Sequence, residues 1–191
     1  MSHSDQMQCE ATFQAHADGV NVVASLPSSQ GEGLVLTAGK DNLVKLWQTT
    51  PSARGTGGSW ACRLLAQYAA HTDAVEGLAI SPSGDRLASC GWDGALLLWR
   101  TGAEIIQAAS EAAAGTAPAT SSKKRKVGGS AGTAASSSSL AAVSESPTSR
   151  LEGHLHCVSS AAWPVEATIF SGGWDHSVSG KVNVTINSTA S

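Results

Sequence analysis

Residues 70–99 read AHTDAVEGLAISPSGDRLASCGWDGALLLW. Alternating apolar stretches, GLAIS and RLASCG, flank the turn-forming SPSGD, and a second turn, GWD, precedes the apolar LLLW. Short alternating stretches separated by turns rich in Gly, Pro and Asp are typical of antiparallel strands. The segment therefore predicts a compact unit made of strands and tight turns, and an all-β fold class.

The same pattern occurs three times, from Ala15 to Trp47, from Ala70 to Trp99 and from Gly153 to Val178. In each copy a Val follows a His by four residues, and an Asp follows a Ser or Thr by four. In the first two copies a Trp follows the Asp by six residues. Such repetition predicts stacked units that bury a shared core. The polar and Trp anchors are His16, Thr37, Asp41 and Trp47, then His71, Ser89, Asp93 and Trp99, then His154, Ser171 and Asp175.

This arrangement resembles the WD40 repeat, in which each propeller blade has four antiparallel strands. The resemblance implies a partial propeller of about three blades. The anchors of one repeat are expected to satisfy one another, with the Asp carboxylate accepting from turn amides and from the His. The hydroxyl group then links the imidazole to the indole N–H, so that all four polar groups tolerate burial. In the third copy Lys181 stands where the Trp is due.

Composition divides the chain into four segments. Residues 10–100 hold two repeats, and residues 150–178 hold a third, incomplete one. Between them, residues 101–149 are rich in Ala, Ser, Gly and Thr and have no aromatic residue. Because such a stretch buries too little apolar surface to offset its ordering entropy, we expect a disordered insert. Residues 179–191 depart from the repeat pattern and are interpreted as a tail foreign to it.

The charge distribution favours protein partners. The chain has 12 Lys and Arg against 15 Asp and Glu, a formal charge of −3. Four cations form one run, so the remainder has 8 against 15, or −7, a poor match for nucleic-acid phosphates. A basic run on a flexible insert is typical of a nuclear localisation signal bound by an import receptor, and the alternative is an ordinary solvated cluster. The run is Lys123, Lys124, Arg125 and Lys126.

Catalytic and metal chemistry are not predicted. The recurring Ser, His and Asp have a structural explanation, and no GxSxG elbow, P-loop or dinucleotide fingerprint occurs. His154, His156 and Cys157 are close in sequence but lack metal-ligand spacing. We expect no enzyme activity, no cofactor, no small-molecule substrate and no membrane span, and an intracellular location with Cys90 and Cys157 as buried thiols.

The residue before each repeat Asp is a candidate for binding partners. These residues are Lys40, Trp92 and Trp174. In a propeller this position lies in a tight turn at one rim, where side chains project outward. Aromatic residues dominate the energetics of many interfaces, so the two tryptophans are candidate anchors. The alternative is that each ring packs across the neighbouring blade.

Beyond the repeat itself, the chain resembles the WD-repeat subunits of Pescadillo-type complexes. The resemblance rests on GHLHCVSSAAWP and SGGWDHSV in the third copy, on residues 70–99, and on the basic insert. The insert follows a Trp-ending strand and precedes a returning strand near Leu151. Members of this family have seven blades behind a ubiquitin-like domain, whereas three repeats are found here, and an open arc predicts marginal folding or association.

The family resemblance implies a protein-binding scaffold in the nucleolus and nucleoplasm that acts in rRNA processing and large (60S) subunit biogenesis. The implied partners are Pescadillo and the block-of-proliferation WD-repeat protein, on pre-60S particles. Two alternatives stay open. One is a nuclear WD-repeat adaptor of chromatin or of a ubiquitin ligase, and the other is a truncated product without function.

Overall fold

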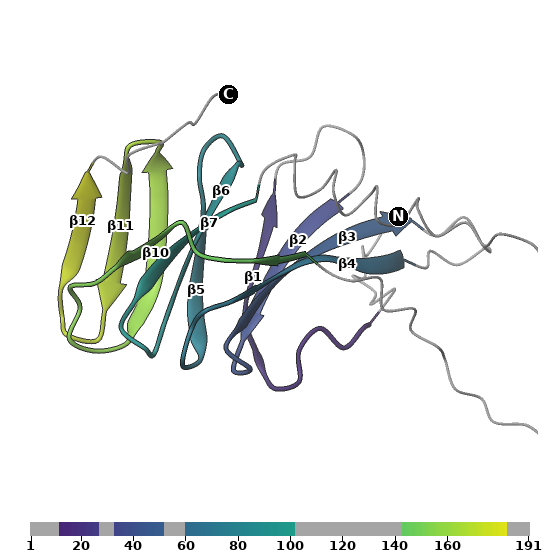
Figure 1. Ribbon diagram of the computed structural model, residues 1–191, viewed down its shortest axis with the longest axis horizontal. Coiled ribbons are helices and arrows are strands. Elements are labelled where there is room, and N and C mark those ends of the chain that lie inside the picture. The colour runs from purple at the N-terminus through teal and green to yellow at the C-terminus, as the bar shows by residue number, and fades with distance from the viewer. Residues whose placement is uncertain (1–11, 27–32, 52–59, 102–142, 183–191) are drawn as a thin grey trace, which may run out of the picture.

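A computed structural model describes residues 12–26, 33–51, 60–101 and 143–182. These residues form twelve strands in three sheets, which stand side by side as an open fan (Figure 1). The first strands of the three sheets are neighbours, since β1 contacts β5 and β5 contacts β10. Each sheet is one propeller blade, and the predicted all-β, partial-propeller fold is confirmed.

Blade 1 is a five-stranded sheet with the order β1-β2-β3-β4-β8. Its strands are β1 Val20–Leu26, β2 Gly33–Gly39, β3 Leu43–Pro51, β4 Trp60–Ala69 and β8 Val143–Glu145. The first four strands pair antiparallel, whereas β8 is parallel to β4. Blade 1 therefore exceeds the four strands expected of a blade.

Blade 2 has the order β5-β6-β7-β9, and blade 3 has three described strands in the order β10-β11-β12. The strands of blade 2 are β5 Val75–Ile80, β6 Arg86–Gly91, β7 Leu96–Arg100 and β9 Ser149–Leu151. Those of blade 3 are β10 Val158–Val165, β11 Thr168–Gly173 and β12 Val178–Val182. All pairings within these two blades are antiparallel.

The insert is shorter than the sequence predicts at its C-terminal end. Residues 143–149 belong to the segment expected to be disordered, yet they contain β8 and the start of β9. β8 pairs with Ala66–Tyr68 on the outer edge of blade 1, and β9 completes blade 2. A sheet edge offers unpaired backbone groups to any passing strand, whatever its composition. The basic run, Lys123 to Lys126, lies outside the described residues.

The third blade also extends further than the sequence predicts, past residue 178. Residues 179–182 continue β12 and pair with β11, with Lys181 opposite Ile169. Backbone pairing requires few particular side chains, so departure from the repeat pattern does not end the strand. The rest of the tail lies outside the described residues.

Two apolar cores join the blades. Successive residues of a strand point to opposite faces of the sheet. In blade 2, odd-numbered Leu87, Leu97 and Trp99 therefore join the core shared with blade 1, and even-numbered Ala88, Cys90, Leu96 and Leu98 join the core shared with blade 3. Cys90 and Cys157 are 0% and 4% exposed, so the prediction of buried thiols is confirmed.

Candidate protein-binding site

In blade 2, a chain of hydrogen bonds links His71, in the segment before β5, to the turn that contains Trp92 and Asp93. His71 Nδ1 lies 2.9 Å from Asp93 Oδ2, and His71 Nε2 lies 2.7 Å from Ser89 Oγ. Trp99 Nε1 donates to the same Ser89 Oγ at 2.8 Å. Because a carboxylate only accepts, His71 Nδ1 carries the proton and the Ser89 hydroxyl donates to Nε2. The four side chains thus satisfy one another inside the sheet.

Blade 1 repeats this network. His16 Nδ1 lies 2.7 Å from Asp41 Oδ1, and His16 Nε2 lies 2.7 Å from Thr37 Oγ1. Trp47 Nε1 donates to Thr37 Oγ1 at 2.9 Å. The turn position of each blade is therefore fastened to its own sheet by buried polar contacts.

Blade 3 has the same network without an indole. His154 Nδ1 lies 2.9 Å from Asp175 Oδ2, and His154 Nε2 lies 2.9 Å from Ser171 Oγ. Ser177 Oγ takes part too, donating to Asp175 Oδ1 at 2.8 Å. Lys181 Nζ points elsewhere and donates to the carbonyl of Glu152 at 3.4 Å.

The turn carboxylates have shifted pKa values. Burial opposes ionisation of Asp93 and raises its pKa, but the hydrogen bond from His71, with those from the Ala95 and Thr72 amides, outweighs this and lowers the pKa. The balance has the same sign at Asp41, where His16 is the main stabilising partner. These carboxylates are ionised structural acceptors.

The Ser, His and Asp sets are not arranged for nucleophilic catalysis. Ser89 is 0% exposed, and its Oγ is occupied by both His71 and Trp99. A nucleophile needs access to substrate and a nearby oxyanion site. Among the described residues, no group of three or more His, Cys, Asp or Glu side chains is arranged to hold a metal ion. The described part of the chain also contains no helix able to cross a membrane.

The three residues before the repeat Asp occupy equivalent places at one rim. Each backbone amide donates at 2.9 Å to the carbonyl of the residue that precedes the first strand of its blade. The pairs are Lys40 with Gly19, Trp92 with Ala74, and Trp174 with Cys157. This close approach requires glycine in the preceding turn, since a Cβ on Gly91 would lie 2.2 Å from the Ala74 carbonyl oxygen. The rim side chains therefore project from rigid turns.

Trp92 and Trp174 meet across the boundary between blades 2 and 3. Their ring centroids are 4.9 Å apart at an interplanar angle of 65°, an edge-to-face arrangement. They are nevertheless 45% and 59% exposed. Each ring therefore packs against the other across the blade boundary and also faces solvent, and their use as interface anchors stays a prediction. Lys40, at the same position in blade 1, is also exposed.

Glu76 is a residue of this site that sequence reasoning missed. Its Oε1 accepts a hydrogen bond from Trp92 Nε1 at 2.8 Å and another from Asn21 Nδ2 at 3.0 Å. Asn21 also donates to the Val75 carbonyl at 3.0 Å, which links β1 of blade 1 to β5 of blade 2. A signal was available, because Glu76 and Asn21 each follow the Val anchor of their repeat.

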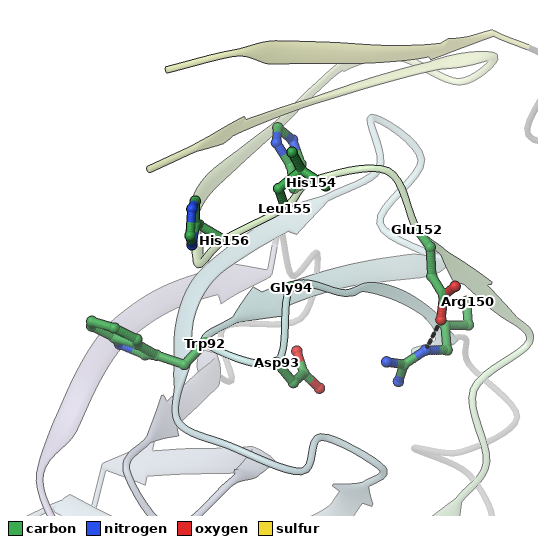
Figure 2. Close-up of a pocket in the computed structure, with 8 residues that line it drawn as sticks. All are labelled: Trp92, Asp93, Gly94, Arg150, Glu152, His154, Leu155 and His156. Atoms are coloured by element: carbon green, nitrogen blue, oxygen red, sulfur yellow. Dashed lines mark hydrogen bonds and ion pairs between the residues drawn. The ribbon is translucent and has the colours of Figure 1, made fainter. Parts of the chain in front are cut away.

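A hollow of about 220 Å³ adjoins Trp92 (Figure 2). It lies between the Trp92–Gly94 turn and the connector that leads into blade 3. On its far side Arg150 Nε donates to Glu152 Oε1 at 2.8 Å. The connector adds His154, Leu155 and His156. The hollow is thus lined mainly by polar residues, and Trp92 is its aromatic border.

Three such blades, each with its buried His, hydroxyl and Asp set, define a WD-repeat β-propeller protein. The family described as "WD domain, G-beta repeat" matches residues 7–48, 62–100 and 145–179, and the chain belongs to this family. Over 172 residues it is 52% identical to the "Ribosome biogenesis protein WDR12 homolog" of Chlamydomonas reinhardtii, covering 90% of this chain and 35% of that protein.

Other similarities agree. The protein of the same name from Arabidopsis thaliana is 31% identical, over 89% of this chain and 36% of its own length. The chain therefore spans about a third of the length of these relatives. Among solved structures, the WD40 β-propeller domain of Doa1 matches with a TM-score of 0.53 and 17% identity, over 91% of this chain and 40% of that one. This last likeness shows the fold alone.

Proposed function

We propose that the chain is a protein-binding part of a WD-repeat scaffold in large ribosomal subunit biogenesis and rRNA processing, and that it has no enzyme activity. The observation that carries the proposal is the 52% identity, over 90% of the chain, to a protein named for ribosome biogenesis. Identity at this level over nearly the whole chain makes a shared role the simplest explanation.

The geometry supports a scaffold role because it makes the rim rigid. Buried hydrogen bonds hold each turn against its own sheet, as His71 does through Asp93. An exposed aromatic pair on such a support loses little conformational entropy when a partner covers it. Trp92 and Trp174 are therefore the proposed anchors, with Lys40 as a further contact on the same rim.

The proposed partners are Pescadillo and the block-of-proliferation WD-repeat protein, on pre-60S particles in the nucleolus and nucleoplasm. The basic run from Lys123 to Lys126 is the proposed contact for an import receptor. The run lies in the segment between the end of β7 at Arg100 and the start of β8 at Val143.

The experiment is affinity purification of the tagged chain from its own cells, followed by mass spectrometry. We expect recovery of Pescadillo and of large-subunit assembly proteins. The double variant Trp92→Ala/Trp174→Ala is expected to lose them while keeping the β-sheet circular dichroism, since both rings are largely exposed. Recovery of chromatin or ubiquitin-ligase components instead would contradict the proposal, and so would recovery of chaperones alone.

A further inference from the structure

The tryptophan pair has a carboxylate at its base. Glu76 Oε1 receives the indole N–H of Trp92 at 2.8 Å and the amide of Asn21 at 3.0 Å. Among the described residues, no donor pairs with the other oxygen, Oε2, and no cation forms an ion pair with Glu76. The carboxylate is therefore positioned by neutral donors, and no cation of the described residues pairs with it.

Other acidic residues surround the same point. Burial raises the pKa of the Cys157 thiol, and the charges of Glu76, Asp73 and Asp93 raise it further. Cys157 in turn accepts the backbone amide of Trp174. Negative charge therefore lies close to Trp92, because Glu76 accepts its indole N–H and Asp93 follows it in the chain, although Asp93 is engaged by His71.

Ring orientation adds to this field. The face of an indole carries negative quadrupole charge, and it attracts a cation within about 6 Å of the ring centre. Donation of the Trp92 N–H to a carboxylate increases the electron density of that ring. The edge-to-face contact with Trp174, at 65°, occupies one side of the pair and leaves both rings partly open to solvent.

We propose that Trp92, Trp174 and Glu76 form a binding site for an arginine side chain of a partner protein. This inference rests on the proposed role as a protein-binding scaffold and specifies the chemistry of its rim. Arginine fits better than lysine because a planar guanidinium stacks on an aromatic ring and donates in a fork to a carboxylate. Residues that flank the arginine extend into the hollow bordered by Trp92 and Arg150.

The test is an NMR titration of the full chain with the peptide acetyl-Gly-Arg-Gly-amide. The observed signals are the indole N–H resonances of Trp92 and Trp174, assigned with single Trp→Phe variants. The matched control peptide carries citrulline, which has nearly the shape of arginine without its charge. We expect saturable shifts of both resonances with the arginine peptide and about tenfold weaker binding of the citrulline peptide.

A pair of variants isolates the carboxylate. Glu76→Gln keeps an acceptor for Trp92 but removes the charge, and it is expected to weaken arginine binding about tenfold. Glu166→Gln, in the turn at the opposite end of blade 3, is expected to leave binding unchanged. Glu166 accepts the Ser83 amide, at the end of the sheet away from the tryptophan pair.

Several outcomes would overturn the assignment. Equal shifts with the arginine and citrulline peptides would show that the charge of the side chain does not contribute to binding. Equal binding of a lysine peptide would show that the site binds any cationic side chain and is not specific for arginine. No saturable shift up to the solubility limit of the peptide would mean that the site does not bind guanidinium. Because purified protein is used, each of these outcomes leaves recovery of ribosome-assembly proteins as a separate question, and the two proposals can fail independently.

Discussion

Lys181 lies directly opposite Ile169 in blade 3, in the register position where Trp99 lies opposite Leu87 in blade 2. The lysine turns away to the carbonyl of Glu152, so the hydroxyl of Ser171 has no indole donor from this position. Blade 3 therefore keeps the backbone pairing of a WD repeat but lacks one of its four polar contacts. This difference makes a direct measurement of the indole contribution possible.

Restoring the missing indole is expected to stabilise blade 3. Lys181→Trp places an N–H near Ser171 and buries a large ring, and the expected gain in unfolding free energy is about 1–2 kcal/mol. The measurement is the midpoint of urea unfolding. Lys181→Phe is the control, since it adds apolar area without a donor. Equal stabilisation by both variants would show that the hydrogen bond contributes nothing.

Removing the shared hydroxyl of blade 2 is expected to destabilise the chain strongly. Ser89→Ala leaves the buried Trp99 N–H without its acceptor and His71 Nε2 without its donor. Each unsatisfied buried group costs about 1–3 kcal/mol, so the expected loss is roughly 2–4 kcal/mol by urea unfolding. The matched variant Ser171→Ala affects one such contact and is expected to cost less. A larger loss at Ser171 would contradict this reading of the network.

Acid is expected to destabilise the chain through Asp93. Its folded pKa lies below the ordinary value of 3.8, so ionised Asp93 favours the folded state above that pH. This contribution is lost as the pH falls from 3.8 through the lowered folded pKa. Asp93→Asn lacks the titration, and its unfolding free energy is expected to fall less steeply over that range. Parallel acid profiles for the two proteins would exclude the linkage.

Removing the hydroxyl of Tyr68 is expected to be neutral or stabilising. This side chain is fully buried, and its hydroxyl has no hydrogen-bond partner among the described residues. Burial and the nearby Glu145 carboxylate raise the pKa of Tyr68, so the phenol stays neutral. Tyr68→Phe keeps the edge-to-face contact with Trp99, and the expected gain is up to about 1 kcal/mol.

The control for this prediction is Tyr68→Leu. It removes both the hydroxyl and the ring contact with Trp99, whose centroid lies 5.4 Å away. We expect Tyr68→Leu to lower the free energy of unfolding, and Tyr68→Phe not to lower it. If Tyr68→Phe destabilised the chain by 1 kcal/mol or more, the hydroxyl would have a partner in solution, and hydrogen exchange at β8 would show whether that partner is on this strand.

Much of the candidate site was predictable because its residues belong to a short repeat. The rim positions of Trp92 and Trp174 follow from the turn before each repeat Asp, and the turn is specified locally by Gly91 and its equivalents. Glu76 was missed because its role depends on a contact with Trp92, sixteen residues along the chain and in the turn after another strand. The repeat marks the position after the Val anchor, but it does not show which side chain will contact that position.

The sequence by itself determined the blades, since alternating apolar residues and repeated turn chemistry act over a few residues and decide which face of each strand is buried. It also determined where the fourth polar contact would be missing, at Lys181. Only the tertiary structure decided that β8 adds to blade 1, that Trp92 meets Trp174, and that Glu76 lies beneath them. These features depend on which sheet edges and turns are brought together when the blades pack, and that is a property of the whole fold.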